Sequence, residues 1–225
     1  MAESILPPLL ISLKTVLATT AITFFAGIAA ARWMARYSGR FKNLIDSLFI
    51  LPLVLPPTVV GFGLLLLLGR NSPIGGLLDA LGTSIVFSWP ATVIAAAVMS
   101  FPLMYMTARG GFEQVDINIE NAARTLGANE WRVFWTVTMP LAWPSIVSAT
   151  ILALARCLGE FGATLMLAGN IPGKTATIPV AIYFNIQGGH YDQAMILAAI
   201  VLVISLASLT ILAYYKQKVR KAARN

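Results

Sequence analysis

The chain has 225 residues, of which 58% are hydrophobic and 11% are charged, whereas about a quarter of the residues in an ordinary soluble domain are charged. Its net charge is +7, but the basic residues cluster at the ends of apolar stretches rather than on a polar face with interleaved aromatic side chains, which argues against a nucleic-acid partner. With Cys157 as its only cysteine, the chain cannot form an internal disulfide framework or a cysteine metal site. The composition indicates a protein that is embedded in lipid.

Five stretches without charged residues are each close to or above the length of about 17 to 25 residues that crosses a bilayer. They cover residues 15–31, 47–69, 80–108, 133–155 and 193–215. The N-terminus lacks the basic start and the cleavage site of a secretory signal, so we expect the first stretch to be a retained helix. We predict an all-α integral membrane protein with about five transmembrane helices, forming a single transmembrane domain over residues 1–225 with its core at about 9–215.

The basic residues predict how the spans are oriented. Twelve of the sixteen lie in three segments: Arg32, Arg36, Arg40 and Lys42; Arg109, Arg124 and Arg132; and Lys216, Lys218, Arg220, Lys221 and Arg224. By the positive-inside rule these segments are cytoplasmic, whereas residues 70–84 and 169–192 belong outside. This alternation requires an odd number of spans, with the N-terminus outside and the C-terminus, including a basic tail at 216–225, inside.

The second stretch contains the run LPLVLPPTVVGFG, with Pro52, Pro56 and Pro57. Membrane helices tolerate proline where neighbouring helices or water satisfy the freed backbone groups. The prolines are compatible with an ordinary kink or with a break that lets segments approach closely. Gly61 and Gly63 in the same run are small enough for helix packing positions.

The longest predicted cytoplasmic connection, residues 109–140, carries the pattern of a short helix. Apolar residues recur in it at i, i+3, i+4 and i+7: Ile119, Ala122, Ala123 and Leu126. We expect a helix at about 118–126, capped by Asp116 or Asn118 and ended by a left-handed Gly127. A helix this short is unstable alone in water. It must pack on its own bundle or dock on a partner, and the pattern leaves both open.

A longer spacing pattern runs through this connection. Asn121, Ala122 and Ala123 are followed after three residues by Gly127, and after nine more by Val137, Met139 and Pro140. This resembles the coupling loop of ABC importer permeases, whose pattern is Glu-Ala-Ala, three residues, Gly, nine residues and Ile-x-Leu-Pro. The acidic residue departs from that pattern, because Glu120 lies one position before the usual glutamate.

The resemblance implies a permease that forms a homodimer and is coupled to cytoplasmic ATP-binding cassette ATPase subunits. The implied coupling residues are Glu120, Asn121, Ala122, Ala123, Gly127 and Pro140. Since the chain has no G-x-x-x-x-G-K-[ST] phosphate loop, ATP and Mg²⁺ would be bound by the ATPase, and the chain would be a transport subunit that is not itself an enzyme and binds no cofactor. An external substrate-binding protein and the lipid of the bacterial inner membrane complete the implied partners.

A charged pair follows the fourth stretch. Arg156 and Glu160 are four residues apart, so on a helix they share a face and can form an ion pair. We expect Glu160 to lie deep in the fourth span, where charges usually face the bundle interior or a water-filled cavity. The pair either fixes helix packing or, with Phe161, lines the translocation pathway or its gate.

Residues 153–179 contain three short runs: Gly-Glu-Phe-Gly-Ala from Gly159, Asn-Ile-Pro-Gly from Asn170 and Thr-Ile-Pro from Thr177. They resemble the corresponding region of molybdate permeases, and the resemblance extends over nearly the whole chain. Sulfate permeases are similar here but tend toward Tyr in place of Phe161. The resemblance implies import of molybdate, with tungstate, sulfate or thiosulfate as the alternative substrates.

Residues 175–191 are apolar enough to suggest a sixth span. Pro179, Asn185, Gln187 and the pair Gly188 and Gly189 make that costly in lipid, and a sixth span would also place the basic tail outside. We predict that this segment is an external or partly re-entrant part of the gate.

Two other classes of membrane protein fit less well. An intramembrane enzyme lacks support because there is no H-E-x-x-H or G-x-S-x-G motif, and the only histidine, His190, follows a Gly-Gly turn. A channel or secondary transporter would be favoured by inverted repeats, and none is convincing in this sequence.

Overall fold

The computed structural model describes residues 2–222, with side chains from residue 5 to 217. The helices are α1 (Ala2–Arg36), α2 (Lys42–Val54), α3 (Pro57–Leu68), α4 (Pro73–Ala80), α5 (Trp89–Glu113), α6 (Ile117–Thr125), α7 (Glu130–Val133), α8 (Met139–Leu158), α9 (Gly162–Ala168), α10 (Ile178–Gln187) and α11 (Tyr191–Ala222), and a π-helical turn, η1 (Phe134–Thr138), joins α7 to α8. No strand occurs in the described range, and the all-α prediction is confirmed. The tail residue Arg224 lies outside that range.

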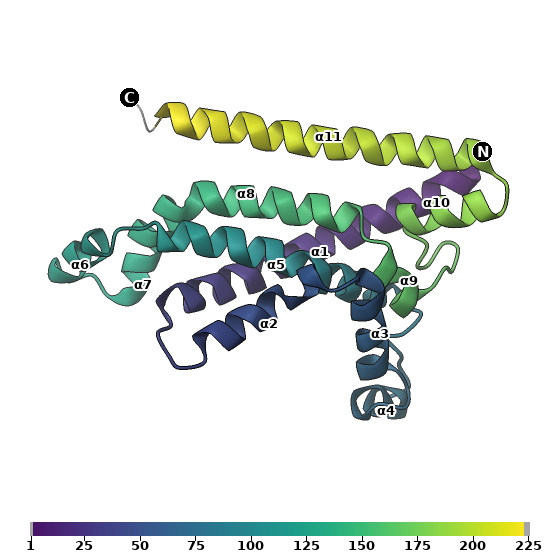
Figure 1. The fold of residues 1–225 in the computed structure, drawn as a ribbon, viewed down its shortest axis with the longest axis horizontal. Helices are drawn as coiled ribbons and strands as arrows, with labels where there is room; N and C mark the ends of the chain where they lie inside the picture. The colour runs from purple at the N-terminus through teal and green to yellow at the C-terminus, as the bar shows by residue number, and fades with distance from the viewer. Residues whose placement is uncertain (1, 223–225) are drawn as a thin grey trace.

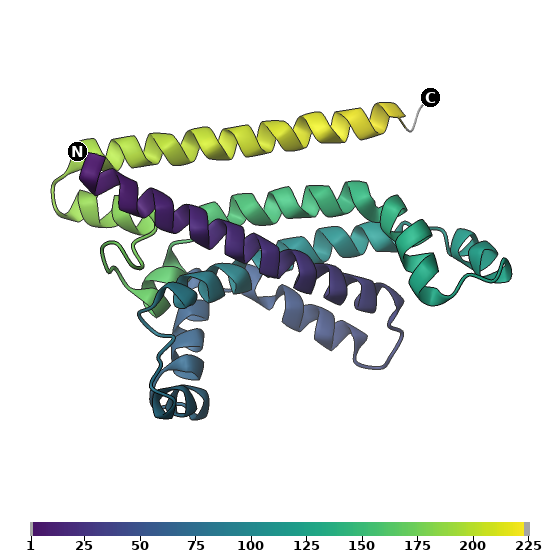
Figure 2. The ribbon, with the colours of Figure 1, turned by 180° about the vertical axis from the view of Figure 1, so that it is seen from behind.

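Helices α1, α5 and α8 form the centre of the molecule and lie side by side in two opposite views (Figure 1, Figure 2). Their shared core contains the small side chains of Ala108 and Ala149 beside the larger ones of Met34, Met104 and Ile146. Small residues allow close approach of helix backbones in a membrane, where the hydrophobic effect does not drive helices together. Three of the predicted spans therefore build the packed centre.

Among the described residues, four helical segments are long and apolar enough to cross a membrane: Ile5–Arg36, Trp89–Glu113, Glu130–Leu158 and Tyr191–Gln217. The helix pair α2 and α3 raises the number to five if it is counted as one span, which agrees with the prediction of about five. The third stretch starts later than predicted, because residues 81–88 form turns and the helix begins only at Trp89.

The second predicted span is broken rather than kinked. Helices α2 and α3 meet at 113°, and α3 and α4 point away from the central bundle (Figure 1). Leu55 is extended, as expected for a residue that precedes a proline, and Pro57 takes the first position of α3, where its missing N–H has no helical partner to lose. The two interpretations of this run are thereby resolved in favour of a break.

Gly61 and Gly63 differ in their surroundings although both lie in α3. A Cβ on Gly61 would lie 2.7 Å from Ala163 Cα in α9, whereas a Cβ on Gly63 would meet no atom within 4 Å. We expect Gly61→Ala to destabilise the protein by about 1–3 kcal/mol through overpacking, and Gly63→Ala to be neutral or to stabilise α3 by up to about 1 kcal/mol. Thermal unfolding in detergent tests this pair, and equal midpoints for the two variants would contradict it.

The chain between α8 and α11 does not form a further full span. Helix α9 has 7 residues and α10 has 10, which is too short for a bilayer. The loop between them and α10 itself return the chain to the end of the bundle where α11 starts (Figure 1). The prediction that residues 175–191 do not make a sixth span is confirmed.

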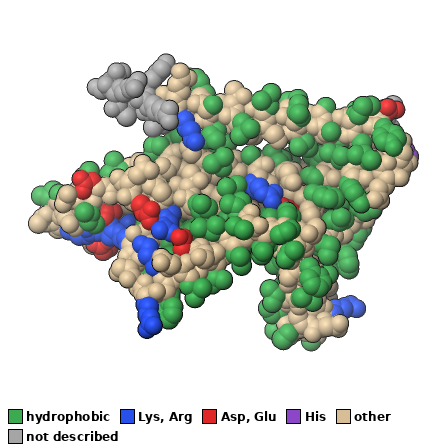
Figure 3. All heavy atoms as spheres, in the orientation of Figure 1, with side chains coloured by type: hydrophobic (Ala, Val, Ile, Leu, Met, Phe, Trp, Pro, Cys, Tyr) green, Lys and Arg blue, Asp and Glu red, His purple; other side chains and the backbone are tan. Residues whose placement is uncertain are grey.

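Charged side chains gather at the opposite end of the molecule, around α6 and α7 (Figure 3). The C-terminal ends of α1 and α5 also lie there, so the segments with Arg32, Arg36, Arg109 and Arg124 share one end as the charge alternation requires. That this end is cytoplasmic stays a prediction.

Candidate coupling site and gate segment

Helix α6 begins and ends through local chemistry. Asp116 Oδ1 accepts a hydrogen bond from the backbone N–H of Asn118 at 2.8 Å, which satisfies one of the free N–H groups at the helix start. Gly127 has φ +85°, a left-handed conformation that glycine adopts without a Cβ penalty. The predicted helix is confirmed, with bounds one residue earlier than expected.

The outer face of α6 is apolar and has no cover in the described chain. Ile119 is 48% exposed and Leu126 is 89% exposed, and Ala122 between them is also exposed. Asn121 is exposed beside this face, whereas Ala123 is half-buried. The apolar stripe therefore does not pack on its own bundle, and of the two interpretations the structure favours docking on a partner.

The inner face of α6 carries a buried carboxylate. Glu120 is 3% exposed and forms an ion pair with Arg36, while Arg32 and Arg124 approach it at 3.5 and 3.6 Å. It also accepts a hydrogen bond from Thr138 Oγ1 of η1. Three cations and a hydroxyl thus compensate the desolvation of one carboxylate.

The position of Glu120 separates it from the other predicted coupling residues. Its side chain points into the permease, while Asn121 and Ala122 face outward. Gly127 ends α6, and Pro140 is exposed in the first turn of α8. The structure thus brings the predicted coupling residues to one end of the molecule but divides them between two faces of the loop.

A second set of contacts holds α6 against α7. The Glu130 carboxylate accepts hydrogen bonds from Arg124 Nη2 at 3.1 Å and from Arg36 Nη1 at 3.4 Å. The bond that Arg124 donates to Glu130 raises the pKa of Arg124. Arg32 also lies over the ring of Phe134, 5.6 Å from its centroid. Sequence reasoning treated Arg32 and Arg36 only as topology signals, although their i, i+4 spacing could have marked them as a pair on one helix face.

The predicted ion pair at the other end of α8 is confirmed. Arg156 Nη1 lies 2.9 Å from Glu160 Oε2, and Glu160 Oε1 also accepts the backbone N–H of Ala163 at 2.9 Å. Glu160 is buried, yet it lies beyond the end of α8 and not deep in a span as predicted. Helix α8 ends at Leu158, and Glu160 in the following turn satisfies a free N–H in the first turn of α9.

Phe161 and the α9–α10 loop complete the gate segment, which we define as residues 159–187. The Phe161 ring packs on the Tyr183 ring of α10 with centroids 5.2 Å apart. At the start of α10, the backbone N–H of Ile178 donates to Ser12 Oγ of α1 at 2.8 Å. Sequence reasoning did not identify Ser12, since its partner is 166 residues away.

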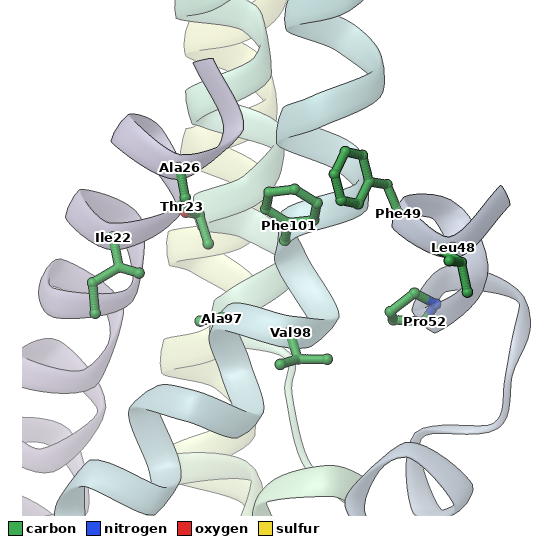
Figure 4. Close-up of a pocket in the computed structure, with 9 residues that line it drawn as sticks. All are labelled: Ile22, Thr23, Ala26, Leu48, Phe49, Pro52, Ala97, Val98 and Phe101. Carbon is green, nitrogen blue, oxygen red and sulfur yellow. The ribbon is translucent and has the colours of Figure 1, made fainter. Parts of the chain in front are cut away.

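A cavity of about 270 Å³ lies between α1, α2 and α5 (Figure 4). Its walls are mainly apolar: Ile22, Leu48, Phe49, Pro52, Val98 and Phe101. Thr23, its one hydroxyl, already donates to the carbonyl of Thr19 at 2.9 Å. An anion stripped of water needs cations or free hydrogen-bond donors, so this cavity does not suit an anionic substrate.

The protein is thus a bundle of membrane-spanning helices with an exposed apolar face on the short helix at its charged end. Residues 22–221 match the family described as binding-protein-dependent transport system inner membrane component, and the chain belongs to this family. It is an ABC importer permease and a multi-pass protein of the bacterial inner membrane.

Its relatives include permease proteins of molybdenum and sulfate transport systems. The molybdenum transport system permease protein ModB of Escherichia coli (strain K12) is 48% identical over 206 residues, which are 90% of this chain and 89% of that protein. ModB of Haemophilus influenzae is 43% identical and covers 86% of each chain. A probable sulfate transport system permease protein of Chlorokybus atmophyticus is 35% identical over 87% of this chain and 68% of its own length.

The solved structures agree in fold. A chain of a bacterial alginate ABC transporter, in complex with a periplasmic protein that holds an alginate pentasaccharide, has a TM-score of 0.78. Its sequence is 17% identical, and the match covers 97% of this chain and 80% of that one. At this identity the likeness shows the permease fold alone.

Proposed function

We propose that the chain is the permease subunit of an importer that moves molybdate into the cell, driven by ATP hydrolysis in a separate subunit. Membership of the permease family and the molybdenum-transporting relatives support the transport role. The observation that carries the ATP coupling is the uncovered apolar face of α6, built from Ile119, Ala122 and Leu126.

The α6 face has the chemistry of a helix that lies in a groove. Its contact residues recur along one side of the helix, and Ala122 at its centre allows close approach of another surface. The charged side chains that would oppose burial are directed to the other side, where Glu120 is already paired. In this proposal the groove belongs to the cytoplasmic ATPase subunit.

The proposed substrate fits the electrostatics of the gate segment. Molybdate is a tetrahedral dianion, and its pathway must avoid unpaired carboxylates. The buried Glu160 carboxylate is neutralised by Arg156 and by the Ala163 N–H. We place the pathway between two copies of the chain, as a homodimer that receives molybdate from an external binding protein.

Sulfate is the second candidate substrate, because a sulfate permease is also among the relatives. Tungstate and thiosulfate share the tetrahedral dianionic form and are further candidates. Family membership gives no support to a channel or a secondary transporter.

Uptake of labelled molybdate tests the substrate directly. Cells that contain this subunit, its ATPase and its binding protein should accumulate molybdate, and cells without the subunit should not. We expect competing tungstate to block uptake, since tungstate is a tetrahedral dianion of nearly the same size as molybdate. Competing sulfate, which is smaller, should leave uptake unchanged. Molybdate uptake that persists without the subunit, or that sulfate blocks, would contradict the proposed substrate while leaving the permease assignment intact.

A further inference from the structure

Helix α1 touches both functional segments, one near each end. Towards its C-terminus Arg32 and Arg36 hold Glu120 of α6. Towards its N-terminus Ser12 holds Ile178 at the start of α10. At a rise of 1.5 Å per residue, Ser12 and Arg36 lie about 36 Å apart along the helix axis, which is more than the thickness of the hydrocarbon core.

The contact with α6 is strong because it concentrates opposite charges in a buried place. Arg32, Arg36 and Arg124 surround the one carboxylate of Glu120. Without that carboxylate the three guanidinium groups would repel each other at close range. Separation of α6 from α1 therefore breaks an ion-pair cluster. This cluster holds α6 against α1, although the two helices are not adjacent in the chain.

The contact with α10 replaces a missing helix cap. Thr177 occupies the N-cap position of α10 but makes no capping hydrogen bond, and its buried Oγ1 has no hydrogen-bond partner among the residues that the structure describes. The first free N–H of the helix, on Ile178, is satisfied instead by Ser12 Oγ of α1. The start of α10 is thus fixed to α1 rather than to its own chain neighbour.

The stretch of α1 between these two contacts has no helix breaker. The prolines of α1 are Pro7 and Pro8, which precede Ser12. Gly27 lies where α1 approaches α5, since a Cβ there would be 2.5 Å from Met104 Cγ. Between Ser12 and Arg36 the helix therefore has no proline at which a sharp kink would be expected.

We propose that α1 transmits the movement of α6 to the gate segment, with the Glu120 cluster as its attachment at one end and the bond from Ile178 to Ser12 as its attachment at the other. This rests on the proposed function, because docking of the ATPase on α6 supplies the movement. Glu120 and Ser12 act as positioning residues and need not touch substrate.

A double-mutant cycle across the length of α1 tests the proposal. The complex of the full chain with its ATPase and binding protein is placed in lipid vesicles, and the molybdate moved per ATP hydrolysed is measured for Ser12→Ala, Glu120→Gln and the combination. Each single variant should lower this ratio about fivefold, the factor for a loss of about 1 kcal/mol. The ratio for the double variant should be no lower than that for the more damaged single variant, because one broken attachment already disconnects the helix.

Independent sites that lie this far apart give additive effects, so additive losses in the cycle would overturn the proposal. Matched controls are Glu113→Gln, an exposed acid at the same end of the molecule as Glu120, and Ser148→Ala, a buried serine that bonds only within α8. Both should keep the wild-type ratio. If Glu120→Gln does not fold, Arg36→Gln, which removes the α1 partner of the same ion pair, takes its place.

Two further readouts separate transmission from docking. A spin label at the exposed position 187 on α10, in a Cys157→Ala background, should change its spectrum on ATP binding in the otherwise native complex and lose this response in Glu120→Gln. The ATPase should still copurify with Glu120→Gln, since the outer face of α6 is intact. Loss of copurification would overturn the transmission role and make Glu120 a docking residue, whereas failure of the wild-type complex to bind the ATPase would count against the proposed function itself.

Discussion

We expect the Ala122→Trp variant to insert and fold but to lose its ATPase subunit on purification. Ala122 lies at the centre of the exposed α6 face between Ile119 and Leu126, where an indole adds a bulky ring without displacing any residue of the permease. In a packed groove the extra volume costs about 1–3 kcal/mol or more, which corresponds to about a fivefold or larger loss of affinity. Copurification through a tag on the permease measures the loss.

The matched control is Ala80→Trp, since Ala80 is an exposed alanine at the end of α4, outside the coupling loop. It should keep the ATPase at the wild-type level and show that an additional surface tryptophan does not disturb insertion. Full retention of the ATPase by Ala122→Trp would mean that the α6 face is not the docking surface.

Local chemistry made the α6 helix predictable. The cap at Asp116 and the left-handed Gly127 act over two or three residues, so the sequence alone defines the helix to within one residue. The pair of Arg156 and Glu160 was predictable for the same reason, because its spacing is one turn of helix. Each of these features depends only on residues that are close to one another in the sequence.

The direction in which α6 faces was not predictable from its pattern. In an aqueous setting an apolar stripe normally faces the core, yet here Glu120 faces inward and Leu126 outward. The reversal depends on Arg32 and Arg36, which reach Glu120 only after the chain has crossed the bundle and returned. The 113° bend between α2 and α3 also exceeded what prolines alone indicate, since its size depends on how α3 packs against α9.

The largest effect on assembly should come from Arg156→Met, which leaves the carboxylate of Glu160 buried without its cation. The side chain of Glu160 is 2% exposed and that of Arg156 is 24% exposed, so an unpaired Arg156 can still reach water whereas an unpaired Glu160 cannot. Removing one partner of a buried pair costs on the order of 3–5 kcal/mol. We therefore expect Arg156→Met to lower the yield of folded protein far more than Glu160→Gln does.

The combination of Arg156→Met and Glu160→Gln should recover much of the folded protein, because a neutral amide no longer needs the cation and its oxygen can still accept the N–H of Ala163. Size-exclusion chromatography and thermal unfolding in detergent measure the yield and stability of the wild type, the two single variants and the double variant. A double variant that is as damaged as the sum of the single ones would show that the two charges act separately. Recovery of the fold without recovery of molybdate uptake would assign the pair to the gate, whereas recovery of both would limit it to packing.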